Sequence, residues 1–151
     1  SKVESRQLIR NEADPRLRQM SEPWTGTIQE LEPIVDAMGA AMEEHNGVGI
    51  SAIQIGVPLR LFIACNPPEL FINPRIVERS PATSNHYEGC LSCPNVTVRT
   101  KRAKTVTLEY TSIENKRVRK KFKGIDAVVI QHEFDHINGF LILDRGKVYR
   151  A

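Results

Sequence analysis

Two histidines four residues apart, with a glutamate beside the first, restrict this chain more than any other feature. The segment reads Gln131-His-Glu-Phe-Asp-His136. On a helix, His132 and His136 lie on one face a turn apart with Glu133 next to them, which is the arrangement of a divalent-metal site that carries its own general base. Unpaired imidazoles and carboxylates are costly to bury on a helix that is otherwise apolar. The pattern therefore predicts a buried, metal-binding helix.

The third metal ligand has to come from upstream. A catalytic site of this kind takes three protein ligands and keeps one position open. In the zinc-protease pattern a third histidine would fall at position 142, but this chain has Ile142 there, and no glutamate follows Glu133. Besides upstream carboxylates, the candidate ligands are Cys65, Cys90, Cys93, His45 and His86. Cys90 is favoured because it lies in the short segment Glu88-Gly-Cys-Leu-Ser92.

Two histidines and a thiolate suit Zn²⁺ or Fe²⁺, and the residues alone do not choose between them. A metal held there lowers the pKa of its bound water, so that hydroxide attacks a carbonyl carbon while Glu133 takes the proton and later returns it to the departing amine. The expected reaction is amide hydrolysis. The neutral side chain of Gln54 can supply an N–H donor to the oxyanion.

Three segments of the chain resemble the signature motifs of peptide deformylases, in the same order. They are Gly47-Val-Gly-Ile-Ser-Ala-Ile-Gln54, Glu88-Gly-Cys-Leu-Ser92 and His132-Glu-Phe-Asp-His136. The opening segments Asp14–Arg18 and Ser21–Pro23 are also similar to that family, so the resemblance covers nearly the whole chain.

Two features depart from the family pattern. Ser51 stands where the first motif usually has alanine, which is a small-for-small change. The chain also ends soon after the histidine helix, so it is similar to the short forms that lack a C-terminal helix, including phage-encoded ones.

The resemblance implies an α+β fold in which the HExxH helix packs against antiparallel β-sheets, with residues 1–151 as a single catalytic domain. It implies removal of the N-formyl group from N-formylmethionine of newly synthesised polypeptides. It also favours Fe²⁺ as the physiological metal, with Zn²⁺ or another divalent ion able to substitute.

The resemblance further implies a role for each matching residue. The expected metal ligands are Cys90, His132 and His136, and the expected base is Glu133. Gln54 and the backbone N–H of Leu91 are the expected oxyanion donors. The expected substrate-binding residues are Val48, Gly49, Leu91 and Val129. Glu88 is expected to support the Cys90 loop through hydrogen bonds.

Composition narrows the class of protein. The 151 residues, 40% hydrophobic and 26% charged, are typical of one globular domain. No apolar run approaches the roughly 18–20 residues needed to cross a bilayer, and the acidic residues near the N-terminus do not fit a signal peptide. Three cysteines, an odd number, favour free thiols in a reducing compartment. We expect a cytoplasmic monomer, or an organelle-matrix protein if a presequence was removed, with Cys65 in the core of a strand and Cys93 in packing.

The net charge is only +3, yet basic residues form two clusters. The first cluster comprises Arg99, Lys101, Arg102 and Lys104, and the second is the segment 116–123. Alternation favours a strand in the second segment, with Val118 and Phe122 inward and the charges in solvent. The alternative is a nucleic-acid surface, in which case transient ribosome contact is expected rather than DNA binding.

Apolar periodicity predicts two helices. The first begins at a Thr27–Glu30 capping box, or nearer Leu31 because of Pro33, and ends at Asn46-Gly47. The second covers about 125–138, with Gly139 as its C-cap. Between them, β-branched and alternating segments predict antiparallel strands at 59–65, 71–78, 96–99, 105–112 and 117–122.

Two rival functions are considered. A small HExxH metalloprotease would require a downstream ligand that this chain lacks. A metal- or ribosome-binding module without turnover would have no need of Glu133 and Gln54 around an open metal position.

Overall fold

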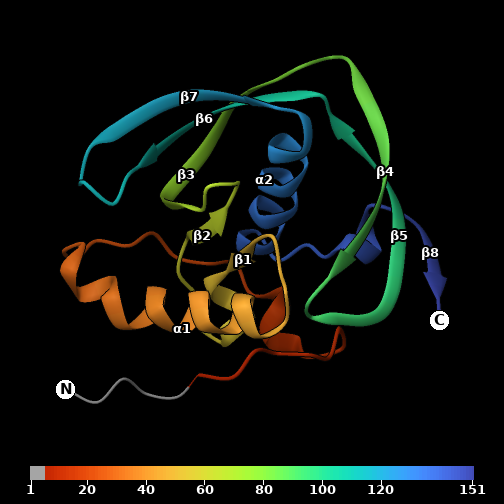
Figure 1. Ribbon diagram of the computed structural model, residues 1–151, viewed down its shortest axis with the longest axis horizontal. Helices are drawn as coiled ribbons and strands as arrows, with labels where there is room; N and C mark the ends of the chain where they lie inside the picture. The colour runs from red at the N-terminus through yellow and green to blue at the C-terminus, as the bar shows by residue number, and fades with distance from the viewer. Residues whose placement is uncertain (1–5) are drawn as a thin grey trace.

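The computed structural model describes residues 6–151. Two α-helices and eight strands form an α+β fold, as expected (Figure 1). The helices are α1 (Glu32–Glu44) and α2 (Gly124–Ile137). The strands are β1 (Ile50–Ser51), β2 (Leu61–Ala64), β3 (Glu69–Arg79), β4 (Thr83–Cys90), β5 (Cys93–Ala103), β6 (Thr105–Thr111), β7 (Arg117–Lys123) and β8 (Gly146–Arg150). Short 3₁₀ turns lie at η1 (Pro15–Arg18), η2 (Gln29–Leu31), η3 (Ala52–Ile55) and η4 (Ile142–Asp144).

The strands form two sheets. The larger has the order β1-β2-β3-β6-β7 and the smaller has the order β4-β5-β8, with every ladder antiparallel. Helix α2 runs through the middle of the molecule with the larger sheet on one side and the smaller on the other (Figure 1). The predicted packing of the HExxH helix against antiparallel sheets is therefore confirmed.

Helix α2 is held by a core that it shares with the larger sheet. Its Val129, Ile130 and Ile137 join a buried cluster of aromatic side chains from the sheet. These are Phe62, Phe71, Tyr110 and Phe122, with neighbouring ring centroids 4.5–5.6 Å apart. Burial of apolar and aromatic area on this scale fixes the helix in place, and with it the side chains on its opposite face.

A backbone motif closes the C-terminal end of α2. Gly139 adopts a left-handed conformation with φ 82°, the N–H of Phe140 donates to the carbonyl of Asp135 at 3.0 Å, and that of Gly139 donates to His136 at 3.1 Å. These two bonds are those of a Schellman motif, so the predicted C-cap is confirmed. A side chain at Gly139 would place its Cβ 2.6 Å from the carbonyl oxygen of Arg18.

Helix α1 begins after the predicted capping box. The N–H of Thr27 donates to Glu30 Oε1 at 3.0 Å, and the N–H of Glu30 donates to Thr27 Oγ1 at 3.2 Å. A 3₁₀ turn follows, and the α-helix starts at Glu32, which leaves Pro33 in the first turn where its missing N–H costs nothing.

Strand β7 is an edge strand of the larger sheet. Phe122 is buried and Val118 packs against the same core, which confirms the predicted inward side chains. The cations of this strand are exposed, namely Arg117, Arg119, Lys120, Lys121 and Lys123.

All five predicted strands are present, as β2, β3, β5, β6 and β7, with shifted ends, and β5 is much longer than predicted. Three strands were missed, β1, β4 and β8. No helix in the described part of the chain is long and apolar enough to cross a membrane.

Candidate active site

Strand β4 and helix α2 bring three potential metal ligands together. Cys90 is the last residue of β4, and His132 and His136 lie one turn apart on α2. One ligand atom from each lies within 4.8 Å of the other two, and Cys90 Sγ is 3.4 Å from His136 Nε2. A thiolate and two imidazoles at this spacing fit a divalent transition metal.

Burial and hydrogen bonds keep the two imidazoles suited to metal binding. Burial lowers the pKa of His136 well below its usual value, so this ring is neutral and able to coordinate. His132 pairs its Nδ1 with Glu88 Oε1 at 2.9 Å, which leaves Nε2 free. Burial opposes a charge on His132, but the carboxylates of Glu133 and Glu88 outweigh it and raise its pKa.

Glu88 belongs to a buried network of charges. Arg102 donates to it twice, from Nε to Oε2 at 2.8 Å and from Nη2 to Oε1 at 2.9 Å, and Thr100 donates to Oε2 as well. Burial would raise the pKa of Glu88, but the bonds from His132 and Arg102 outweigh it and hold that pKa well below its ordinary value. Glu88 therefore stays ionised and orients the His132 ring.

Arg102 extends this network one turn along α2. Its Nη1 donates to Asp135 Oδ2 at 2.7 Å, and Asp135 also accepts two bonds from Arg145. The sequence had grouped Arg102 with a basic surface cluster, and that assignment is wrong, because the side chain is only 5% exposed. Strand alternation explains the error, since Lys101 faces solvent and Arg102 faces α2.

Glu133 lies buried beside the ligand cluster. Burial raises its pKa to about 7, and its Oε2 is 4.0 Å from His132 Nε2. Ser51 Oγ lies 3.0 Å from both Glu133 Oε1 and the Glu133 carbonyl oxygen. The departure from the family's alanine therefore adds a hydroxyl donor at this carboxylate, which sequence reasoning missed. The backbone of Gly49 also lies against the Glu133 carboxylate, since a Cβ added at Gly49 would be only 2.8 Å from Glu133 Oε2.

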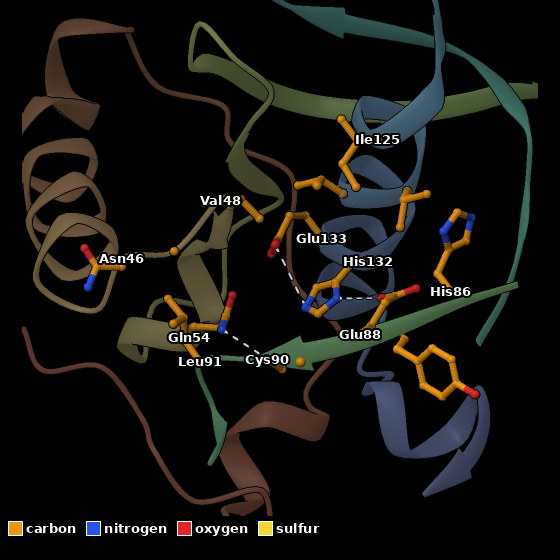
Figure 2. Close-up of a pocket in the computed structure, with 16 residues that line it drawn as sticks. Asn46, Val48, Gln54, His86, Glu88, Cys90, Leu91, Ile125, His132 and Glu133 are labelled. Atoms are coloured by element: carbon orange, nitrogen blue, oxygen red, sulfur yellow. Dashed lines mark hydrogen bonds and ion pairs between the residues drawn. The ribbon is translucent and has the colours of Figure 1, made fainter. Parts of the chain in front are cut away.

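Gln54 is fixed with its amide nitrogen toward Cys90. Its Oε1 accepts from the backbone N–H of Ser51 at 2.9 Å in the 3₁₀ turn η3. Its Nε2 donates to Ser92 Oγ at 3.1 Å. The same Nε2 lies 3.7 Å from Cys90 Sγ (Figure 2). A neutral donor is thereby placed at the edge of the ligand cluster.

A cleft of about 470 Å³ opens over these groups (Figure 2). All four predicted substrate-binding residues line it, namely Val48, Gly49, Leu91 and Val129. Gln54, Cys90, His132 and Glu133 line it too. Val48 and Ile125 at its mouth are 71% and 70% exposed, so the cleft is open and partly apolar.

The other ligand candidates lie apart from this cluster or serve other contacts. Cys93 is buried in packing, as expected. Cys65 packs against the core shared by α2 and the larger sheet, as expected, but it directly follows the end of β2, so its predicted place within the strand itself is wrong. His45 caps α1 and contacts Arg10, and His86 bonds Ser84 at the cleft wall.

The fold and the site define an α+β hydrolase-type protein with a thiolate–imidazole metal site and a buried glutamate. A family model described as polypeptide deformylase matches residues 7–150. The chain belongs to the peptide deformylase family, metal-dependent hydrolases that remove the N-formyl group from newly made polypeptides.

Individual relatives are similar over most of their length. A peptide deformylase of Thermotoga neapolitana is 40% identical over 141 residues, covering 92% of this chain and 86% of its own. The crystal structure of the Thermotoga maritima enzyme superposes with a TM-score of 0.88 at 38% identity, covering 93% and 98% of the two chains. An Acinetobacter baumannii enzyme with Met-Ala-Ser bound has a TM-score of 0.87 at 32% identity, covering 93% and 99%.

Proposed function

We propose that this protein hydrolyses the N-formyl amide of formylmethionyl peptides, with Cys90, His132 and His136 holding a divalent metal. The observation that carries the proposal is the meeting of their three ligand atoms within 4.8 Å at a cleft that Glu133 also lines. A metal bound there supplies Lewis acidity and lowers the pKa of a bound water. The remaining steps belong to the side chains of the chain itself.

Glu133 is the proposed general base and acid. A carboxyl with a pKa of about 7 is divided between its two protonation states near neutral pH, so it can take a proton from the attacking water and return it to the leaving amine. Gln54 Nε2 and the backbone N–H of Leu91 are the proposed donors to the oxyanion that forms on the formyl carbon. The bonds that fix Gln54 on its other side support this role, because a fixed donor needs no reorganisation during reaction.

The cleft would hold the methionine side chain against Val48, Leu91 and Val129. Each of these residues lines it, and Gly49 leaves room for the small formyl group beside Glu133. The Acinetobacter baumannii relative, crystallised with Met-Ala-Ser, supports a peptide beginning with methionine as the ligand of this cleft.

The physiological metal is proposed to be Fe²⁺, with Zn²⁺ or another divalent ion able to substitute, since one thiolate and two imidazoles suit both. We further propose that residues 1–151 act as one monomeric catalytic domain in the cytoplasm or in an organelle matrix. Because the substrate is a nascent chain, transient contact with the ribosome follows from the same proposal.

Formate release from an N-formylmethionyl tripeptide tests the reaction, using protein purified without oxygen. Glu133→Gln should lower the release rate by about 10²–10⁴-fold, because the isosteric amide cannot accept the proton, while the variant keeps its metal content. A parent that binds metal and releases no formate would contradict the proposal and favour a protease or a binding module. If Glu133→Gln released formate as fast as the parent, the proposed role of Glu133 as the base would be wrong, but the proposed reaction would stand.

A further inference from the structure

The outer face of the β4-β5-β8 sheet combines exposed aromatic rings with unpaired cations. Its central row runs across all three strands, since Tyr87 pairs in register with Arg99 and Arg99 with Lys147. Lys101 and Tyr149 share this face by strand alternation. We call these five residues the tyrosine face. It lies opposite the side of the sheet on which Glu88 and Arg102 meet α2.

The two rings are exposed yet lie close together. Tyr87 and Tyr149 are 68% and 42% exposed, and their centroids are 6.2 Å apart across β5. Lys147 Nζ lies 5.4 Å from the Tyr149 centroid. Single exposed apolar residues are ordinary, but aromatic rings grouped together on a surface are a feature of binding interfaces, where tyrosine is enriched.

The charge of the face has one sign only. Glu88 is the single acidic residue of β4, β5 and β8, and it is buried on the opposite side. Within the described residues, Arg99, Lys101 and Lys147 form no ion pair with a carboxylate, whereas Arg119 of β7 pairs with Glu109. Three cations are therefore available to an anionic partner.

We propose that the tyrosine face binds single-stranded RNA. Bases stack on exposed aromatic rings without regard to sequence, and neighbouring cations contact the phosphates, which is the chemistry that a sheet with two tyrosines and three cations provides. A duplex would not suit it, because paired bases cannot reach the rings. An acidic peptide would use the cations but leave the rings without a planar partner.

The proposal deepens the ribosome contact given above by naming its surface and its partner. Tyr87 also lines the mouth of the cleft, so RNA held on this face would lie beside the entrance for the peptide substrate. Deformylation of free peptides does not depend on it, so the two proposals can fail separately.

Fluorescence anisotropy with a labelled pyrimidine RNA of about twelve nucleotides tests the stacking. The metal-loaded protein should bind at about 50 mM salt, where phosphate contacts are strong. Tyr149→Leu should weaken binding about five- to hundredfold, whereas Tyr149→Phe, which keeps the ring, should bind like the parent. Formate release should be the same in all three proteins, because Tyr149 lies outside the cleft.

A pair of matched charge variants separates this face from charge in general. Arg99→Ser with Lys101→Ser should flatten the slope of log K against log salt by about 1.4, or about 0.7 for each lost contact. Arg119→Ser with Lys121→Ser removes the same charge from β7 and should leave the affinity nearly unchanged.

Four results would each overturn the proposal. They are no binding of the single strand at low salt, binding of duplex RNA or of single-stranded DNA more tightly than the RNA, full affinity in Tyr149→Leu, and equal loss in the two charge variants.

Discussion

Cys65 is a thiol outside the ligand cluster that packs, half-buried, against the core shared by α2 and the larger sheet, and its surroundings suppress its ionisation. Burial, followed by the nearby carboxylates of Asp126 and Glu69, raises its pKa from 9.0 to about 12. Because the thiolate is the reactive form, we expect Cys65 to react with iodoacetamide more slowly than an exposed cysteine at pH 9, with a rate that keeps rising toward pH 12.

The same shift affects stability with a definite sign. The folded state holds the Cys65 proton more tightly than the unfolded state, so the free energy of unfolding should fall as the pH rises from 9.0 toward about 12. Mass spectrometry after labelling identifies the thiol. Cys65→Ser should make that slope shallower without abolishing it, because burial also raises the pKa of Tyr110 and gives it a contribution of the same sign. A Cys65 that labels at the rate of a free thiol at pH 9 would contradict the expectation.

Sequence reasoning at this scale works where chemistry is encoded locally. The four-residue spacing of His132 and His136 is enough to place both imidazoles on one helix face. Cys90 could be predicted as the third ligand because the chain has no suitable ligand downstream. Ser51 was undervalued because its hydroxyl meets Glu133, a residue 82 positions away. Arg102 was misassigned because cationic neighbours suggested a surface, whereas the partners that bury it lie on other elements.

At the scale of elements, the closure of α2 can be tested by a pair of identical substitutions with opposite outcomes. Gly139→Ala should lower the free energy of unfolding by about 1–3 kcal/mol, because φ is 82° and the new Cβ would lie 2.6 Å from Arg18 O. Gly39→Ala within α1 should raise it by about 0.5–1 kcal/mol, since a Cβ there meets nothing within 4 Å.

Urea unfolding of the two variants and the parent measures both changes. Equal stability of Gly139→Ala and the parent would mean that the Schellman turn can be replaced by another ending of the helix.

The elements that were predicted are those whose apolar pattern is visible in one segment. Helix α2 and β6 are rich in buried side chains, and both were found. Strand β4 was missed because its segment Thr83–Cys90 is mostly polar and buries only Glu88. Strand β8 is short and contains little apolar surface. It forms because the chain that follows α2 runs back alongside β5 and pairs with it, which local strand propensity does not reveal.

At the scale of the whole molecule, Arg102 connects the smaller sheet to α2. Arg102→Leu should lower the free energy of unfolding by about 3–5 kcal/mol, because it leaves the Glu88 and Asp135 carboxylates without their buried partner. It should also weaken metal binding about 10–100-fold, because Glu88 orients the His132 ring.

Metal titration monitored by calorimetry, together with urea unfolding, measures the two effects. Arg119→Leu, which removes a surface pair with Glu109, is the matched control and should change neither quantity appreciably. If Arg102→Leu behaved like this control, the buried network would have no part in holding the sheet and the helix together.

The exposed cations along β7 also affect how copies of the protein meet one another. A bare sheet edge is a template on which another chain can add its own strand, and closely spaced positive charges discourage this by mutual repulsion. Two copies approaching edge to edge would bring like charges from Arg117 through Lys123 into register. The cations of β7 thus protect concentrated protein from aggregating through β-strand addition. Added salt should weaken this protection, because it screens the repulsion between the charges.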